Sequence, residues 1–233
     1  MKRASITFFF LLACLAFSTN ANSQNPTISP IATFTDAENH ESTDISFSGS
    51  APIKASFSLN PTNHQGWNAH YEWRFYKEGK AEPYLVRYEE NTEYIFLESG
   101  VNHVACYTTF INGKDTVNFL DDYWRDAQFN ITVYESKLEF PNAFSPNGDG
   151  INDIYRAKPG YQSIIDFKAI IINRWGQKLY EWTTPSNGWD GTFRGKDVKA
   201  GTYYCIVKAR GSDGREFNIK KDVNLMRDYI KSE

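Results

Sequence analysis

The sequence predicts an all-β protein made of two consecutive immunoglobulin-like β-sandwiches that follow a cleaved signal peptide. Aromatic residues make up 16% of the 233 residues, and such side chains suit pleated, half-buried surfaces. Apolar and polar residues alternate in short runs that Gly, Pro and Asn separate, as expected for strands. Neither half of the sequence combines a sustained helical period with capping residues.

The first 23 residues have the pattern of a signal peptide. Two basic residues precede an apolar run over 6–17, and residues 21–23 are small enough for a signal peptidase. We expect a mature chain that starts at Gln24, leaves the cytosol and contains no further stretch long enough to span a bilayer. A second interpretation stays open, because residues 11–14 resemble a lipobox in which Cys14 would be lipidated.

Residues 24–44 are polar and are predicted to form a flexible leader, with 31–34 as a candidate strand. From residue 45 the alternation predicts the first sandwich, over 45–135. Asn112-Gly113 is typical of a tight hairpin. The expected strands cover 45–47, 53–59, 71–75, 94–96, 104–110 and 129–133.

A second set of strands predicts the second sandwich, over 136–233. Turn residues at 173–176 and at 212–214 separate neighbouring strands of this set. The expected strands cover 154–155, 167–172, 178–182, 202–209 and 216–225.

The two predicted sandwiches carry opposite charge. Residues 24–135 hold 7 Lys and Arg against 16 Asp and Glu, a net charge of −9, whereas residues 136–233 hold 16 against 12, a net charge of +4. The net charge of −3 for the whole chain argues against nucleic-acid binding. The basic half either meets an acidic partner or simply has a solvated face. Cys106 and Cys205 predict one buried thiol in each sandwich.

The densest motif runs from Phe140 to Tyr155. Its glycines permit a left-handed backbone, and its Asn and Asp side chains can close the loop by hydrogen bonds. The spacing of Asn147, Asp149 and Asp153 also fits half of a calcium loop, although Arg156 stands where an EF-hand has its bidentate Glu. The sequence leaves two alternatives open, a calcium site and a metal-free turn.

Four shorter motifs follow this loop. Residues 173–176 suggest a turn with an anchoring indole, and 187–192 suggest a glycine-flanked Trp-Asp corner. Residues 200–204 suggest a strand that enters the core through its tyrosines, and 223–227 a final strand that ends in a cation.

The order of these motifs resembles the gliding-motility-associated C-terminal domain, the type B sorting domain of the Bacteroidota type IX secretion system. The residues that carry the resemblance are Pro141, Asn142, Phe144, Pro146, Asn147, Gly148, Asp149, Gly150, Asn152, Asp153, Asn173, Arg174, Trp175, Gly176, Trp189, Asp190, Gly191, Gly201, Tyr203, Tyr204 and Arg227. The resemblance implies export by a Sec-type signal, recognition by an outer-membrane translocon, and display at the cell surface or release. The resemblance implies that the motifs serve folding and recognition by the export machinery. It implies no catalytic role and no cofactor.

The upstream half resembles the polycystic-kidney-disease-like (PKD-like) fold, through a Gly-Ser-Ala-Pro segment at 49–52 and Trp73. Arg74 departs from the pattern of that family, which has Asp at this position. The sequence contains no nucleophile elbow and no phosphate-binding loop, so we expect a non-catalytic protein. Two alternatives are an adhesin that binds a surface glycan or protein by stacking on Trp67, Tyr123 or Trp124, and a lipoprotein subunit of an envelope complex.

Overall fold

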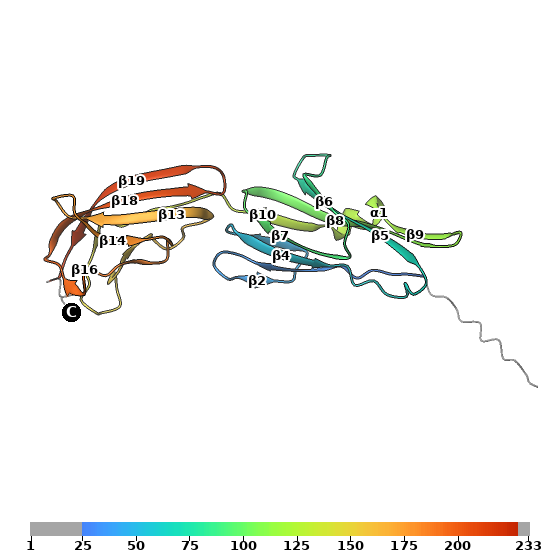
Figure 1. Cartoon of the computed structure of the whole chain (residues 1–233), viewed down its shortest axis with the longest axis horizontal. Coiled ribbons are helices and arrows are strands. Elements are labelled where there is room, and N and C mark those ends of the chain that lie inside the picture. Colours follow the sequence, from blue (N-terminus) through green and yellow to red (C-terminus); the bar gives the residue numbers. More distant parts are fainter. Residues whose placement is uncertain (1–24, 228–233) are drawn as a thin grey trace, which may run out of the picture.

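The structure is a computed structural model that describes residues 25–227. The predicted signal peptide and Cys14 lie outside these residues. Strands account for 53% of the described residues and helix for 3%, which confirms the all-β prediction. Among the described residues, no helix is long and apolar enough to cross a membrane. Figure 1 shows two β-rich domains arranged end to end.

The N-terminal domain is a sandwich of two sheets. One sheet has the order β2-β1-β4-β7, and the other has the order β3-β10-β8-β5-β6 with β9 beside β8. The strands are β1 (Ile31–Thr35), β2 (Glu41–Ser42), β3 (Ser46–Gly49), β4 (Ile53–Ser58), β5 (Asn68–Lys77), β6 (Leu85–Arg87), β7 (Asn91–Phe96), β8 (Gly100–Asn112), β9 (Asp115–Phe119) and β10 (Phe129–Val133). The predicted Asn112-Gly113 hairpin joins β8 to β9.

Aromatic rings from both sheets fill the core of this sandwich. Phe57 lies 5.6 Å from Trp73 and 5.3 Å from Phe129, measured between ring centroids. Trp73 is fully buried, and its indole N–H donates to the carbonyl of Glu89 at 3.0 Å. The strands alternate buried and exposed residues, as in β4, so one face of each sheet supplies this core.

Two features of this domain go beyond what the sequence indicated. The candidate strand at 31–34, within the predicted leader 24–44, forms β1, whose Ala32 and Phe34 are 1% exposed. The sandwich therefore begins upstream of residue 45, because Phe34 stacks on Phe47 at 5.3 Å and β1 pairs with β4. A seven-residue helix, α1 (Asp121–Ala127), was also not expected, since two turns are too short to establish a helical period.

The C-terminal domain is built on a single larger sheet. Its strand order is β11-β19-β18-β13-β14, and two short ribbons, β12-β15 and β16-β17, cover one face of the core. The strands are β11 (Ala143–Phe144), β12 (Tyr155–Arg156), β13 (Ile164–Ile172), β14 (Lys178–Trp182), β15 (Gly188–Trp189), β16 (Thr192–Phe193), β17 (Lys196–Asp197), β18 (Gly201–Gly211) and β19 (Glu216–Leu225). The buried clusters of the two domains divide between Val133 and Leu138.

Hydrogen bonds fix the junction between the domains. The backbone N–H of Ser136 donates to Asp213 at 3.1 Å, and the Ser136 hydroxyl donates to the other carboxylate oxygen at 2.7 Å. Ser212 donates to the carbonyl of Tyr134, and Ala51 donates its N–H to the Ser163 hydroxyl. The linker residue Ser136 is 4% exposed.

Close packing at the junction also requires a glycine. A Cβ atom on Gly211 would overlap the side chain of Ser136. Burial alone raises the pKa of the Asp213 carboxyl, but hydrogen bonds from Ser136 and Arg215 outweigh burial and bring this pKa below its ordinary value. Asp213 therefore remains ionised and holds the linker at neutral pH.

We predict that Asp213→Ala makes the linker accessible to trypsin. The change leaves the Ser136 N–H and hydroxyl without their acceptor, so the linker opens more often. Cleavage after Lys137 should become roughly tenfold faster, because proteolysis follows the population of the open state. The measurement is mass spectrometry of the fragment that ends at Lys137. Asp166→Ala, which removes an exposed carboxylate of the same domain, is the control. Equal cleavage of the two variants would contradict the role of Asp213.

Candidate functional site

The longest motif of the C-terminal domain forms a loop that Asp153 closes. The Asp153 carboxylate accepts backbone N–H bonds from Asn147 at 2.9 Å, Gly148 at 2.8 Å and Gly150 at 2.8 Å. The Gly148 donor contributes most to holding the pKa of Asp153 below its usual range. Asn152 has a φ of 55° and Gly148 a φ of 82°, so the loop uses the left-handed region that its residue types favour.

The predicted calcium ligands lie in this loop and take part in its internal hydrogen bonds. Asp149 accepts the N–H of Ile151 at 2.8 Å and the side-chain N–H of Asn147 at 3.1 Å. Both Asp153 oxygens also accept N–H groups. These contacts describe a hydrogen-bonded turn, and calcium binding at Asn147, Asp149 and Asp153 stays a prediction.

A second motif places Trp189 at the centre of the domain. Trp189 is fully buried, and its indole N–H donates to the carbonyl of Thr192 at 2.7 Å. Its ring lies 5.3 Å from Phe144 and 5.1 Å from Tyr203, measured between centroids. Asp190 closes the same corner by accepting the N–H and the hydroxyl of Thr192.

Gly191 and Arg227 join the last strand to this corner. The Arg227 guanidinium donates to the carbonyls of Gly191 at 2.6 Å and Val198 at 2.9 Å. Gly191 has a φ of 82°, and a Cβ atom there would press on Leu225 and Pro146. Most of the recognised motif residues therefore build the interior of the domain and its closing contacts.

Trp175 differs from these interior residues. It is 75% exposed, so the expectation of an anchoring indole is wrong. Asn173 anchors the turn instead, because its side-chain oxygen accepts the backbone N–H groups of Trp175 and Gln177, each at 3.0 Å. The guanidinium carbon of Arg174 lies 4.2 Å from the centroid of the Trp175 ring. The turn therefore presents a stacked cation and indole to solvent.

An open groove of about 420 Å³ lies beside this turn. Leu179, Phe193, Val198 and Tyr203 supply its apolar walls, and Arg174 and Lys199 supply cations. Among the described residues that line the groove, none is Asp or Glu. The sequence singled out Trp175, Arg174 and Tyr203, but it gave no signal for Lys199 or Phe193, which come from other loops and strands.

The two tyrosines at 203 and 204 do not both enter the core. Tyr203 packs on Trp189, and its hydroxyl donates to the carbonyl of Lys199 at 2.8 Å. Tyr204 is 39% exposed. Successive residues of a strand point to opposite faces, so only one of two neighbouring tyrosines can face inward.

The stacking residues predicted in the N-terminal domain are not gathered into an exposed platform. Trp124 is 2% exposed, and its indole N–H donates to the carbonyl of Cys106 at 2.7 Å. Tyr123 packs edge-on against Trp124 at 5.3 Å, and Trp67 is partly buried against the same core. Trp124 therefore presents no face to a ligand.

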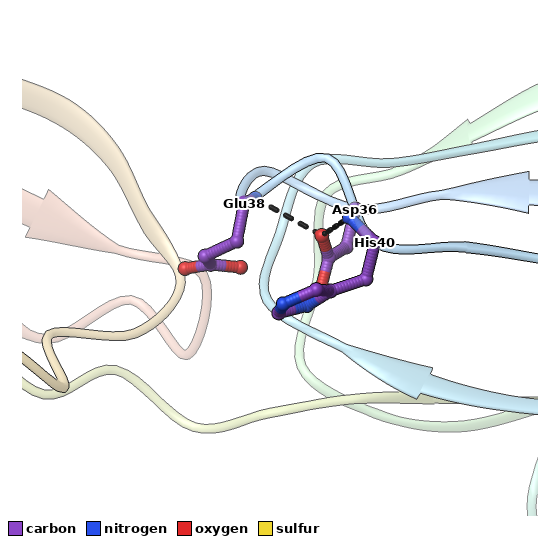
Figure 2. Close-up of side chains that lie close together, drawn as sticks. All are labelled: Asp36, Glu38 and His40. Carbon is purple, nitrogen blue, oxygen red and sulfur yellow. Dashed lines mark hydrogen bonds and ion pairs between the residues drawn. The ribbon is translucent and has the colours of Figure 1, made fainter.

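One group of potential metal ligands occurs among the described residues: Asp36, Glu38 and His40. Figure 2 shows these three side chains at the tight turn between β1 and β2. One oxygen of the buried Asp36 accepts the N–H groups of Glu38 and His40, and the other lies 3.0 Å from His40 Nδ1. Asp36 therefore closes this turn, and its carboxylate is engaged on both oxygens.

The cysteines of the described chain are buried free thiols, as predicted. Burial raises the pKa of Cys106 to about 11 and that of Cys205 to about 12. Both thiols therefore remain protonated at neutral pH, a state that disfavours nucleophilic attack.

These features describe a self-contained β-domain that is joined to an acidic sandwich and closed by its own motif residues. Residues 138–222 match the family model described as the CHU_C type IX secretion signal domain. The C-terminal domain is a type IX secretion signal domain, and the protein is exported to the cell surface or secreted. The resemblance drawn from the sequence motifs is thereby confirmed.

Three solved structures resemble the chain weakly. Domains FN1–FN3 of chicken CNTN1 match with 12% identity and a TM-score of 0.26, covering 75% of this chain and 64% of that one. SGBP-B from the mixed-linkage glucan utilization locus of Bacteroides ovatus matches with 13% identity and a TM-score of 0.27, covering 87% and 48%. Dimeric latent PorU from Porphyromonas gingivalis matches with 14% identity and a TM-score of 0.25, covering 88% and 20%. The chain thus spans less than two thirds of each. No curated protein matches significantly.

We predict opposite consequences for two tryptophan substitutions in the secretion domain. Trp189→Ala removes a fully buried ring and should lower the free energy of unfolding by about 3–5 kcal/mol. Trp175→Ala removes an exposed ring and should change it by less than about 0.5 kcal/mol. Denaturant unfolding of the full chain measures both. Equal destabilisation by the two substitutions would contradict the assigned positions.

We predict that Asp153→Ala lowers the melting temperature at neutral pH and that acid removes the difference. A carboxyl with a depressed pKa stabilises the fold above its unfolded-state pKa of about 3.9, and this contribution disappears as the pH falls through the folded-state value. Thermal melts at pH 7 and at about pH 2 test this expectation. A difference that persists unchanged in acid would contradict it.

The same thermal assay tests the calcium alternative. With the loop closed by N–H donors, we expect chelator to leave the melting temperature at pH 7 unchanged. A melting temperature that calcium raises in the unsubstituted protein, but not in Asp153→Ala, would instead support a calcium site.

Proposed function

We propose that this protein is a non-catalytic surface protein whose C-terminal domain delivers an acidic β-sandwich through the type IX pathway. The supporting observation is the match of residues 138–222 to a type IX secretion signal domain. A non-catalytic role is further supported by the contacts of Trp189, Gly191 and Arg227, because these contacts close the fold of the domain. On this proposal an outer-membrane translocon of the type IX system recognises the folded domain.

The N-terminal domain is the passenger in this proposal. Two of its carboxylates make structural contacts: Asp36 closes a turn, and Asp121 accepts the hydroxyl of Tyr107 at 2.6 Å. The high pKa of its buried thiol also fits a protein without a cysteine nucleophile. The hydrogen-bonded junction at Ser136 and Asp213 supports transport of both domains as one body.

We predict that deletion of residues 138–233 leaves the passenger in the periplasm of a host with a type IX system. The assay is fractionation of the tagged protein, together with protease accessibility at the surface of intact cells. Deletion of residues 228–233 alone keeps the matched domain and serves as the control. Trp189→Ala, which removes one buried motif residue and weakens the fold, should also reduce surface delivery. Surface delivery of the 138–233 deletion at the level of the full chain would refute the proposal.

A further inference from the structure

We propose that the groove beside Trp175 is the surface by which the secretion domain binds its export machinery, and that the occupant is an acidic peptide segment of an outer-membrane protein. This inference rests on the proposed sorting function and assigns it to particular residues. The groove combines an exposed indole, apolar walls and two cations, and its described lining contains no carboxylate.

The exposure of Trp175 requires an explanation, because its turn does not need the ring. Asn173 closes the turn through backbone N–H groups, and its side-chain N–H donates to Gln177 at 3.0 Å. An indole that is 75% exposed contributes little to folding but offers a large apolar area to a partner. Trp and Arg are also the residue types enriched among the energetic centres of protein interfaces.

The charges of the groove select an acidic partner. Arg174 and Lys199 line it, are exposed and have no carboxylate partner among the described residues. Most of the other lining residues are apolar, hydroxyl or amide side chains, so nothing in the described lining offsets the two positive charges. An acidic segment would gain charge-assisted hydrogen bonds from the guanidinium and the ammonium.

The contacts around the indole favour a peptide over a glycan. Sugars stack on free aromatic faces and bind to free amide groups, but the Arg174 guanidinium lies over the Trp175 ring at 4.2 Å. The Asn173 amide is engaged on both sides, because it donates to the Gln177 side-chain oxygen and accepts the backbone N–H groups of Trp175 and Gln177. The stacked guanidinium keeps outward N–H donors, which match the planar geometry of a carboxylate.

The position of the groove leaves it accessible in the whole protein. Strand β13 starts at the junction, where Ile164 pairs with Gly211, and ends at the turn that carries Trp175, where Ile172 pairs with Tyr204. The end of β13 that leads into this turn is remote from the passenger (Figure 1), and the turn residues 173–175 line the groove. A partner can reach it without displacing the N-terminal domain.

The first test measures binding of the purified, labelled mature chain to outer-membrane fragments from a host with a type IX system. We expect Trp175→Ala and the double substitution Arg174→Glu with Lys199→Glu each to weaken binding by at least about tenfold. Lys208→Glu with Lys220→Glu alters two exposed lysines outside the groove, changes the net charge equally and should bind normally. High salt should weaken binding of the unsubstituted chain.

The treatment of the fragments identifies the occupant. Proteolysis of the fragments should abolish binding, as expected for a peptide segment. Binding that survives proteolysis but is lost after periodate oxidation would overturn the inference in favour of a glycan. If the pure chain self-associates and this association depends on Trp175, the occupant is a second copy of the chain and the inference is overturned. If deletion of residues 228–233 tightens binding to the fragments, the groove belongs to that segment and the inference is also overturned.

The second test is surface delivery in cells. Trp175→Ala and the Arg174/Lys199 charge reversal should each reduce it, while their thermal melting stays like that of the unsubstituted chain. Second-site mutations that restore export of the charge-reversed variant can be selected. We expect such a mutation to replace an acidic residue of an outer-membrane protein with a basic one. Suppose that both groove variants reach the surface normally while the deletion of residues 138–233 prevents surface delivery. This result would overturn the groove assignment and leave the sorting function standing. Delivery of the deletion itself would reject both.

Discussion

The ionised Asp213 carboxylate sets the geometry of the whole molecule. It holds both the N–H and the hydroxyl of Ser136, the buried residue that links the two domains. Gly211 lets the chains approach closely at the same place. With the linker bound to the turn between β18 and β19, one end of the secretion domain is committed to the passenger. The opposite end, with the Trp175 turn, is the end that remains for a partner.

Two tryptophans of the same domain show how similar motifs acquire different roles. Trp189 is enclosed by Phe144 and Tyr203, and its N–H is satisfied by a carbonyl. Trp175 lies within a turn that the Asn173 side chain already closes, and its ring is 75% exposed. Burial makes Trp189 a determinant of stability, whereas exposure frees Trp175 for interaction. The motifs of one family can therefore contain buried residues that stabilise the fold and exposed residues that are available for contact with a partner.

The sequence predicted the two-sandwich fold because strand alternation and turn residues are local signals. The hairpin at Asn112-Gly113 needs only its own residues, and β13, β14, β18 and β19 follow directly from alternation. The candidate strand at 31–34 was also a local signal, but its burial as β1 in the first sandwich and the exposure of Trp175 depend on the rest of the fold. Phe34 is buried because Phe47 and β4 cover it, whereas Trp175 is 75% exposed and has the exposed Arg174 stacked on its ring. Lys199 joins the groove only through the fold, which explains why no sequence pattern revealed it.

The opposite charges of the domains gain meaning from this arrangement. Residues 24–135 carry a net charge of −9 and residues 136–233 a net charge of +4, so negative and positive charge are separated along the length of the chain. In the electric field of an acidic partner, such a distribution orients the molecule so that the basic domain faces the partner. On the proposal of an acidic partner, the cations of Arg174 and Lys199 would contact it beside the exposed indole of Trp175. The acidic passenger is repelled from the same surface, so charge would select which end of the protein enters the export machinery first.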